Sequence, residues 1–297
     1  EFWWAVHPSN PRALPALPIT KRPDLGSWPA NWQSRTALMG VINITPDSFS
    51  DGGRFLATEK ALAEASRQLQ RGADVLDLGA QSTRPGADEV GAEEECRRLL
   101  PALVAIREQF PDALLSVDTF LAPVAEAALQ AGANWINDVS GGQRDPEILR
   151  VVADAGCPMV LMHSRGTSKT MDELTNYVDL ITDVKQGLQA RSEAALKAGV
   201  AADQIIWDPG LGFAKTHEQN LMLLKHLEQL IESNIPVLIG PSRKRFIGAV
   251  LNEPRAKARL WGTAAVVCRC AQAGAAVVRV HDVGPISQTL RMAAELW

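Results

Sequence analysis

The chain has few cysteines, no long basic run and no apolar stretch of membrane length, and each absence excludes a class of protein. Four cysteines in 297 residues are too few and too scattered for a disulfide framework, and Cys268 and Cys270 lack the spacing and partners of a zinc site. The 30 basic and 34 acidic side chains give a net charge of -4, without the basic patch that nucleic-acid binding needs. No stretch of 18 apolar residues is free of charge. We therefore expect a cytoplasmic protein with neither nucleic acid nor a membrane as partner.

Several catalytic signatures are missing as well. The sequence contains no Gly-x-Ser-x-Gly elbow and no histidine and cysteine cluster with metal-ligand spacing, so covalent acyl transfer and zinc hydrolysis lack their usual residues. It also lacks a Walker A loop and a dinucleotide-binding glycine fingerprint. The chemistry must therefore come from another arrangement of polar side chains.

The composition is that of a globular protein with an irregular first segment. Hydrophobic residues make up 46% and charged residues 22% of the chain, which permits a large buried core. Residues 1–35 are rich in tryptophan and proline without a helical or strand period, and we interpret them as an arm followed by one domain over 36–297. Because the sequence does not begin with Met, an organellar origin with a processed N-terminus stays open.

From residue 37 onward, short apolar runs alternate with longer amphipathic stretches, which is typical of βα units around a parallel sheet. The apolar runs predict eight strands, at 37–42, 75–78, 114–117, 135–137, 159–162, 205–207, 237–239 and 277–280. The clearest helical stretches are 59–71, 93–109, 176–198, 218–231 and 285–296. This count favours an α/β fold of the (β/α)8 TIM-barrel type over a doubly wound open sheet.

Polar residues stand at or just after the carboxyl end of every predicted strand. These residues are Asn43, Asp77, Asp118, Asn137 with Asp138, His163, Asp208, Ser242 to Lys244, and Arg279 with His281. Any single Asp or Asn in such a place is equally well explained as a helix cap or turn residue. In a barrel, however, all these strand ends meet at one face, so the whole set predicts a single site.

The predicted site combines two kinds of chemical group. Asp118, Asn137 and Asp208 suit the hydrogen-bonding edge of a polar heterocycle, and the carboxylates can stabilise positive charge that develops there. Arg84, Lys244, Arg279 and His281 suit an anion such as diphosphate. A heterocycle that carries a phosphate leaving group would use both sets.

Two turn-rich segments, 45–53 and 82–86, resemble mobile lids because they carry Phe49 and Arg84 among their turn residues. The loop at 208–215 is glycine-rich, and Phe213 within it could stack on a flat ring. The alternative for all three is an ordinary surface turn.

Seven segments together resemble the dihydropteroate synthase family of folate biosynthesis, over residues 36–297 and in the family's order. They are 40–53, 82–87, 116–119, 136–138, 208–213, 242–244 and 279–282. The resemblance implies a transferase that condenses 6-hydroxymethyl-7,8-dihydropterin diphosphate with 4-aminobenzoate to 7,8-dihydropteroate and diphosphate. It also implies Mg2+ as cofactor and a homodimer.

The resemblance also distributes roles over the residues, with Asp118, Asp208, Lys244, Arg279 and His281 as the catalytic set. It assigns the pterin to Asp118, Asn137, Asp208, Phe213, Lys244 and Arg279. The diphosphate falls to Asn43, Arg279 and His281, with Asn43 also reaching the Mg2+ ion. The aminobenzoate and the lids involve Phe49, Asp47, Asp51, Thr83, Arg84 and Ser242.

Three positions depart from the family pattern. Gln81 stands where many members have Glu, Ser164 where Met is common, and Arg245 where a small residue follows the Ser-Arg-Lys motif. We interpret them as variation within an active family and expect Arg245 to lie beside the aminobenzoate carboxylate.

Four other features are expected to have no part in the chemistry. His163 is interpreted as a structural histidine and Lys215 as a solvated lysine. The glutamates at 93–95 are interpreted as the N-terminal turn of a helix with an exposed charged face. Trp135 and Trp207 are expected to be packing residues.

Two other functions remain as alternatives. A corrinoid methyltransferase of the related pterin-binding barrel would keep the Asp and Asn residues but would not need the Ser-Arg-Lys motif. A pterin-binding paralogue without activity would keep the pterin contacts and lose the leaving-group site. Asn43, Arg279 and His281 argue against both.

Overall fold

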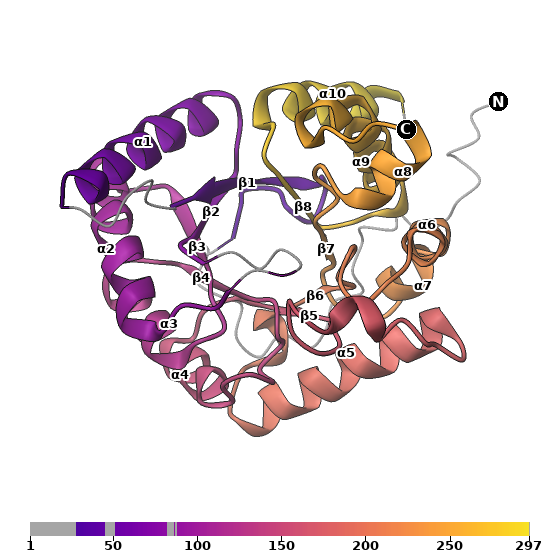
Figure 1. The fold of residues 1–297 in the computed structure, drawn as a ribbon, viewed down its shortest axis with the longest axis horizontal. Coiled ribbons are helices and arrows are strands. Elements are labelled where there is room, and N and C mark those ends of the chain that lie inside the picture. The colour runs from indigo at the N-terminus through magenta and orange to yellow at the C-terminus, as the bar shows by residue number, and fades with distance from the viewer. Residues whose placement is uncertain (1–27, 45–50, 82–85, 87, 297) are drawn as a thin grey trace.

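The computed structural model describes residues 28–44, 51–81, 86 and 88–296, with the side chains of 51–55 left aside. In this part of the chain, strands alternate with helices around a central ring of strands (Figure 1). The strands are β1 (Ala37–Asn43), β2 (Val75–Gly79), β3 (Leu114–Asp118), β4 (Trp135–Asp138), β5 (Met159–Met162), β6 (Ile205–Asp208), β7 (Leu238–Ile239) and β8 (Val277–Val280).

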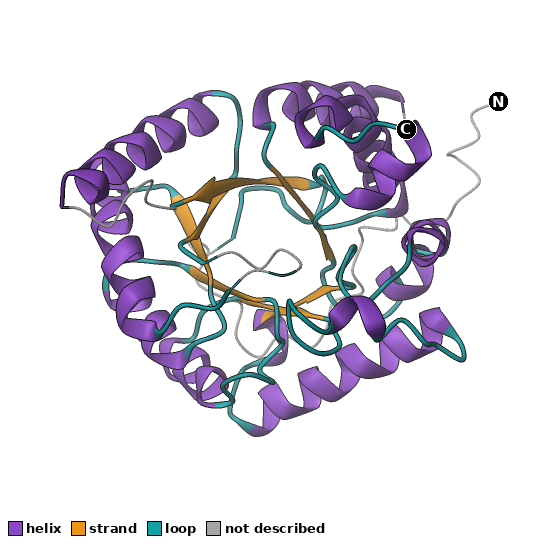
Figure 2. Cartoon of the chain, in the orientation of Figure 1, coloured by secondary structure: helices purple, strands orange, loops and turns teal. Residues whose placement is uncertain are grey.

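The helices form an outer layer around that ring (Figure 2). They are α1 (Asp51–Gln70), α2 (Ala92–Gln109), α3 (Ala122–Gln130), α4 (Glu147–Ala155), α5 (Leu180–Lys197), α6 (His217–Lys225), α7 (Glu228–Ile231), α8 (Arg245–Leu251), α9 (Leu260–Ala273) and α10 (Val283–Leu296). The short 3-10 helices are η3 (Met171–Glu173), η4 (Ala202–Gln204) and η5 (Ala256–Arg259).

The sheet is parallel and closes on itself. Its strand order is β6-β5-β4-β3-β2-β1-β8-β7, and every neighbouring pair is parallel. A parallel bridge between Trp207 at β6 and Val237 just before β7 joins the two ends of this order. The predicted (β/α)8 TIM barrel is therefore confirmed, and the open doubly wound sheet is excluded.

Alternation along the strands sorts side chains between the inside of the barrel and the helix layer. Ile206, Val277 and Trp135 belong to one buried cluster near the amino ends of the strands. Two residues further along the same strands stand Asp208, Arg279 and Asn137, on the same face of the sheet. The inside of the barrel is therefore apolar at one end and polar at the other.

The end of the arm packs against the apolar end of the barrel. Trp28 is only 7% exposed, and its ring centroid lies 4.3 Å from that of Trp32 and 5.0 Å from that of Trp135. Arg35 then forms an ion pair with Asp74, which precedes β2. Trp135 and Trp207 are buried, as expected of packing residues. Of the arm expected over 1–35, residues 28–35 form turns without a helix or strand, and residues 1–27 lie outside the described part of the chain.

The predicted helix at 218–231 is wrong in one respect, because it is two helices, α6 and α7. Arg269 of α9 donates to the carbonyl oxygens of Leu224 and Lys225, at 3.0 and 3.1 Å, and forms an ion pair with Glu228. In a continuous helix those two carbonyls would accept from backbone N–H groups further along. At the break, the Arg269 side chain therefore replaces the backbone N–H groups as donor to these carbonyls.

Candidate active site

Polar side chains from four strands meet inside the barrel at the carboxyl end of the sheet. They are Asp77 of β2, Asp118 of β3, Asn137 of β4 and Arg279 of β8. Arg279 Nε lies 2.6 Å from Asp77 Oδ2, and Arg279 Nη2 lies 2.9 Å from Asp118 Oδ2. Asn137 Nδ2 donates to Asp77 Oδ2 at 3.1 Å. The structure therefore brings together three predicted residues and Asp77, which sequence reasoning placed at a strand end but gave no role.

This cluster carries unused hydrogen-bonding capacity. Oδ1 of Asp77 and Oδ1 of Asp118 are buried and have no hydrogen-bond partner in the described part of the chain. Burial raises the pKa of Asp118 above its ordinary value, while the neighbouring charge of Arg279 lowers it. Two buried acceptors without partners are costly unless a ligand supplies donors, so this floor suits a ring rich in N–H groups.

Asp208 lies in the same polar layer and is held by the glycine-rich loop that follows it. Its Oδ1 accepts from the backbone N–H of Gly210 at 2.7 Å. Burial raises the pKa of Asp208, and the Gly210 N–H and the charge of Lys244 lower it. Lys244 Nζ lies 4.5 Å from the ring centroid of Phe213, a cation–π contact between the two loops. Burial also lowers the pKa of Lys244 to about 8, against the attraction of Asp208.

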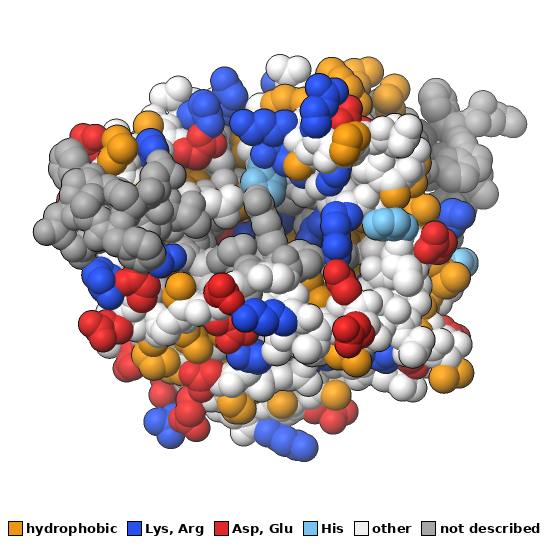
Figure 3. Space-filling view, viewed as in Figure 1, with side chains coloured by type: hydrophobic (Ala, Val, Ile, Leu, Met, Phe, Trp, Pro, Cys, Tyr) orange, Lys and Arg blue, Asp and Glu red, His pale blue; other side chains and the backbone are white. Residues whose placement is uncertain are grey.

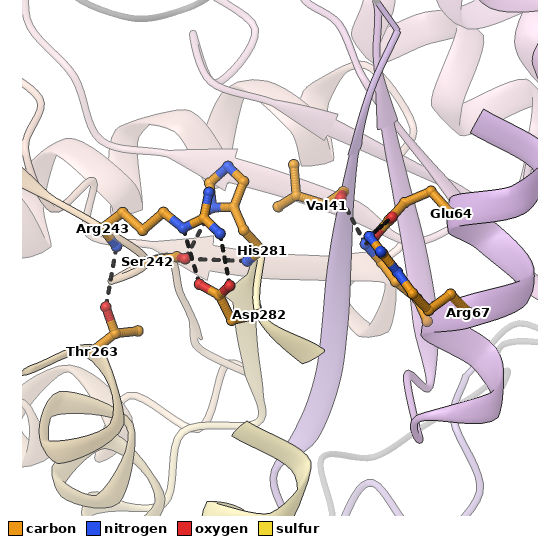
Figure 4. A network of polar contacts seen from close by, with 9 residues as sticks. Val41, Glu64, Arg67, Ser242, Arg243, Thr263, His281 and Asp282 are labelled. Carbon is orange, nitrogen blue, oxygen red and sulfur yellow. Dashed lines mark hydrogen bonds and ion pairs between the residues drawn. The ribbon is translucent and has the colours of Figure 1, made fainter. Parts of the chain in front are cut away.

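The Ser-Arg-Lys turn after β7 is fixed by contacts with the end of β8 (Figure 4). Ser242 Oγ accepts from the backbone N–H of His281 at 3.1 Å and lies 2.9 Å from its Nδ1. Arg243, at a positive φ of 59°, makes a two-point ion pair with Asp282 at 2.9 and 2.6 Å. The turn thus brings Ser242 and His281 together and leads directly into Lys244.

Basic side chains and a histidine are visible on this face of the molecule, near the ends of β1 and β8 (Figure 3). Asn43 ends β1 there, is exposed, and lies in register with Gly79 of β2. Among the described residues, no group of three or more His, Cys, Asp or Glu side chains could hold a metal ion. The exposed amide of Asn43 offers one oxygen, a hard donor of the type that Mg2+ accepts.

The predicted lid residues fall largely outside the described part of the chain. Asp47, Phe49, Thr83 and Arg84 are not described, and Asp51 is the first residue of α1, with its side chain left aside. Gln81, which precedes the second predicted lid, is described: its Oε1 accepts from the backbone N–H of Val90 at 2.6 Å.

Two expectations about side chains outside the site are wrong. Lys215 is 8% exposed instead of solvated, because its Nζ folds back onto carbonyl oxygens of its own loop. Glu95 is fully buried instead of lying on an exposed helix face, since it points from α2 toward Gln81. The acidic neighbours Glu93 and Glu94 do not share this burial. Helical periodicity was the available signal, because Glu95 lies four residues before the buried Leu99.

Arg245 and Ser164, two of the departures from the family pattern, each have a hydrogen-bond partner in the structure. Arg245 is exposed and pairs with Asp172 at 2.8 Å, which satisfies the charge expected beside a substrate carboxylate. Ser164 Oγ donates to the carbonyl oxygen of Val139 at 3.1 Å, so this serine ties two βα loops together. His163 is buried, as expected of a structural histidine.

A barrel with a carboxylate and arginine floor and a basic rim defines a class of enzyme that binds a polar heterocycle. The chain belongs to the pterin-binding enzyme family, whose model matches residues 39–281. It also resembles the dihydropteroate synthase of Synechocystis sp., to which it is 47% identical over 95% of this chain and 96% of that one. Within the pterin-binding enzymes, the chain therefore belongs to the dihydropteroate synthases.

Solved structures agree with this assignment. A Xanthomonas albilineans dihydropteroate synthase with 4-aminobenzoic acid matches with a TM-score of 0.82 and 42% identity, over 89% of this chain and 93% of that one. The enzyme from the same organism in complex with 7,8-dihydropteroate matches with a TM-score of 0.78 and 39% identity, over 89% and 94% of the two chains. The corrinoid methyltransferase alternative is therefore excluded.

Proposed function

We propose that the site at the carboxyl end of the barrel condenses 6-hydroxymethyl-7,8-dihydropterin diphosphate with 4-aminobenzoate, giving 7,8-dihydropteroate and diphosphate. The observation that carries this proposal is the Arg279 cluster, in which two buried carboxylates each keep one oxygen without a hydrogen-bond partner among the described residues. The N–H groups along one edge of a pterin are donors of the kind that those oxygens lack.

Asp118, Asn137, Asp208 and Lys244 hold the pterin in this proposal, with Phe213 and Arg279 supplying flat surfaces for its ring. Support comes from the electrostatics of the cluster, because the charges of Lys244 and Arg279 act on the Asp208 carboxylate. Arg279 also serves the diphosphate. The two ion pairs engage its Nε and Nη2, and a guanidinium has five N–H donors in all.

Asn43, Arg279 and His281 hold the diphosphate. Mg2+ would be the cofactor, and Asn43 would be the residue that holds it beside the diphosphate. When bound, it neutralises charge on the leaving group. Removing Mg2+ with a chelator is expected to abolish turnover, and adding it back restores the rate.

The reaction is dissociative. The bond between the exocyclic carbon and the diphosphate oxygen breaks first, and its electron pair leaves with the diphosphate. Asp118 and Asp208 stabilise the pterin cation that remains, an effect typically worth about 3 kcal/mol for each preorganised contact. The neutral aromatic amine then attacks the carbon, and the new C–N bond is complete when the nitrogen releases a proton to water. Thr83, Arg84, Phe49 and Ser242 frame the aminobenzoate, and Asp47 and Asp51 belong to the closing lid.

The assembly is a homodimer in this proposal, located in the cytoplasm. Trp261 and Val250, on the adjacent helices α9 and α8, are 78% and 62% exposed, which suits an interface between two copies. All four cysteines are free, as is typical of a reducing compartment. No helix in the described part of the chain is long and apolar enough to cross a membrane.

A substrate-dependence assay tests the activity. Diphosphate release is measured with both substrates and Mg2+, and again with aminobenzoate omitted. Release that requires aminobenzoate, with formation of dihydropteroate, is expected. Tight pterin binding without release under both conditions would instead identify a pterin-binding paralogue without activity.

A further inference from the structure

The loop between β6 and α6 has an uncommon backbone conformation. Gly210 and Gly212 have positive φ angles of 70° and 77°, and Ala214 has one of 50°, which is uncommon for a residue with a side chain. A Cβ atom on Gly210 would lie 2.0 Å from the carbonyl oxygen of His163, so the loop runs directly against the end of β5. Conformations of this kind persist only where the surrounding contacts over-determine them.

Asn220 accepts from the backbone N–H of Gly212 at 2.7 Å, and Tyr177 donates to the carbonyl oxygen of Ala214 at 2.9 Å. Lys215 supplies three further contacts from inside the loop. Its Nζ lies 3.1 Å from the carbonyl oxygen of Gly210, 2.9 Å from that of Phe213 and 3.1 Å from Nδ1 of His163. Burial lowers the pKa of Lys215 to about 7, although the charge of Asp208 raises it. In the ammonium form, which has three N–H donors and no acceptor, all three donors are used. Lys215 is buried, so water does not compete for these contacts.

The same contact determines the tautomer of His163. While Lys215 is protonated it only donates, so Nδ1 of His163 accepts and the ring proton sits on Nε2. Burial, reinforced by the charges of Lys215 and Arg191, lowers the pKa of His163 to about 2 and keeps the ring neutral. The pair thus links the end of β5 to the loop that follows β6.

The turn from Gly210 to Phe213, which Lys215 holds, carries groups of the proposed pterin site at both ends. The N–H of Gly210 holds the Asp208 carboxylate at 2.7 Å, while the carbonyl of the same residue is held by Lys215. At the other end, the carbonyl of Phe213 is held by Lys215, and its ring faces Lys244. A change at Nζ of Lys215 would therefore shift an acid and an aromatic ring of the site together.

We propose that Lys215 is a positioning residue for the pterin: its ammonium clamps the Gly210 to Phe213 turn onto His163 and so sets where Asp208 and Phe213 meet the ring. This inference rests on the proposed function, since it takes Asp208 and Phe213 to be pterin contacts. It predicts a selective effect on pterin affinity, because the aminobenzoate is framed by other loops.

The test compares Lys215→Met, which keeps the length of the side chain and removes its donors, with Lys215→Arg and with Lys225→Met as a control on the exposed face of α6. Binding of 6-hydroxymethyl-7,8-dihydropterin is measured by calorimetry, and KM for each substrate by steady-state kinetics. We expect Lys215→Met to weaken pterin binding about tenfold or more, because two buried carbonyls lose a charged donor. KM for aminobenzoate should stay within about twofold, Lys215→Arg should be intermediate, and Lys225→Met should match the wild type.

Pterin affinity within about twofold of wild type in folded Lys215→Met would overturn the inference, as would an equal rise in both KM values. A second measurement needs no folded variant. Long-range 1H–15N spectra of the wild-type protein at a pH below the pKa of Lys215, with the signals of His217 and His226 as references, should show His163 neutral with its proton on Nε2. A proton on Nδ1, or a charged ring, would also overturn it.

Failure of the proposed function looks different from failure of this inference. If Asp208→Asn leaves pterin binding unchanged in a folded protein, then the pterin site itself is misplaced. If Asp208→Asn weakens binding and Lys215→Met does not, only the role of Lys215 is wrong.

Discussion

Arg279 of β8 and Asp118 of β3 are 161 residues apart in sequence, yet Nη2 of the arginine lies 2.9 Å from Oδ2 of the aspartate. Two strands, β2 and β1, separate them in the sheet. The ion pair therefore reaches past two intervening strands inside the barrel. Because Asp118 keeps its second oxygen without a partner among the described residues, the pair leaves one acceptor ready for a ligand.

Asp118→Asn is expected to lower kcat by about a hundredfold or more, because the substitution removes a preorganised negative charge from the site of the developing cation. The fold should persist, since an amide of the same shape can still accept from Arg279. Diphosphate release and far-ultraviolet circular dichroism measure the two effects. Asp112→Asn, at an exposed turn, serves as the control, and a kcat near that of wild type in Asp118→Asn contradicts the assignment.

Trp28→Ala is expected to destabilise the protein by about 3 kcal/mol, the usual loss when a large buried aromatic side chain is truncated. Trp28 packs at the end of the barrel opposite the site, so kcat should change by less than about twofold in the folded protein. Urea unfolding gives the stability. The control is Val178→Ala, which truncates an apolar side chain that is fully exposed and should change the stability by less than about 0.5 kcal/mol. Equal losses in the two variants would show that the arm contributes nothing specific.

Glu95 should make the stability depend on pH in an unusual direction. Burial raises its pKa from 4.5 to about 7, although its hydrogen bond with Thr119 and the charge of Arg98 act the other way. Between these values the folded protein binds more protons than the unfolded chain, so the contribution of Glu95 to stability falls as the pH rises. Relative to Glu95→Gln, the wild type should lose about 3 kcal/mol of unfolding free energy between pH 4.5 and 7.

Urea unfolding at a series of pH values checks this prediction. Groups common to both proteins contribute to both curves, and their difference isolates Glu95 and its effect on the nearby Asp118. Parallel curves for the two proteins would mean that Glu95 titrates as an ordinary surface carboxylate.

Arg243→Lys is expected to lower kcat/KM by about tenfold without loss of the fold. Lysine cannot make the two-point contact with Asp282 that holds this turn at a positive φ, and Ser242 and Lys244 on either side of it should lose their fixed positions. Arg255→Lys is the matched control, because it changes an arginine whose ion pair with Glu253 is largely exposed. Unchanged kinetics in Arg243→Lys would show that the turn holds its shape without this ion pair.

The sequence predicts the strands and the polar layer for a physical reason. A buried parallel strand is a short apolar run, and its carboxyl end lies at one face of the barrel whatever surrounds it. For this reason Asp118, Asn137, Asp208 and Arg279 were predicted to converge, and the structure places all four in one polar layer. Asp77 was seen at its strand end but had no assigned role, since nothing local shows that it binds both Arg279 and Asn137.

The sequence gives a wrong prediction of burial for side chains whose surroundings come from distant segments. In the sequence, Lys215 resembles any lysine before a helix. In the structure, its own loop and His163, which lies 52 residues earlier, enclose it. Glu95 belongs to a charged run, and only the packing of α2 against the sheet buries it. The break between α6 and α7 likewise depends on Arg269, 41 residues beyond Glu228.

The amino-acid sequence by itself determined the alternation of strands and helices and the residue types at the carboxyl ends of the strands, because hydrophobic period and strand length act locally. Only the tertiary structure decided which charges became buried and which partners they found. The free energy of a buried charge depends on neighbours that the fold brings within a few ångströms. The spacing of residues along the chain does not show which residues become such neighbours.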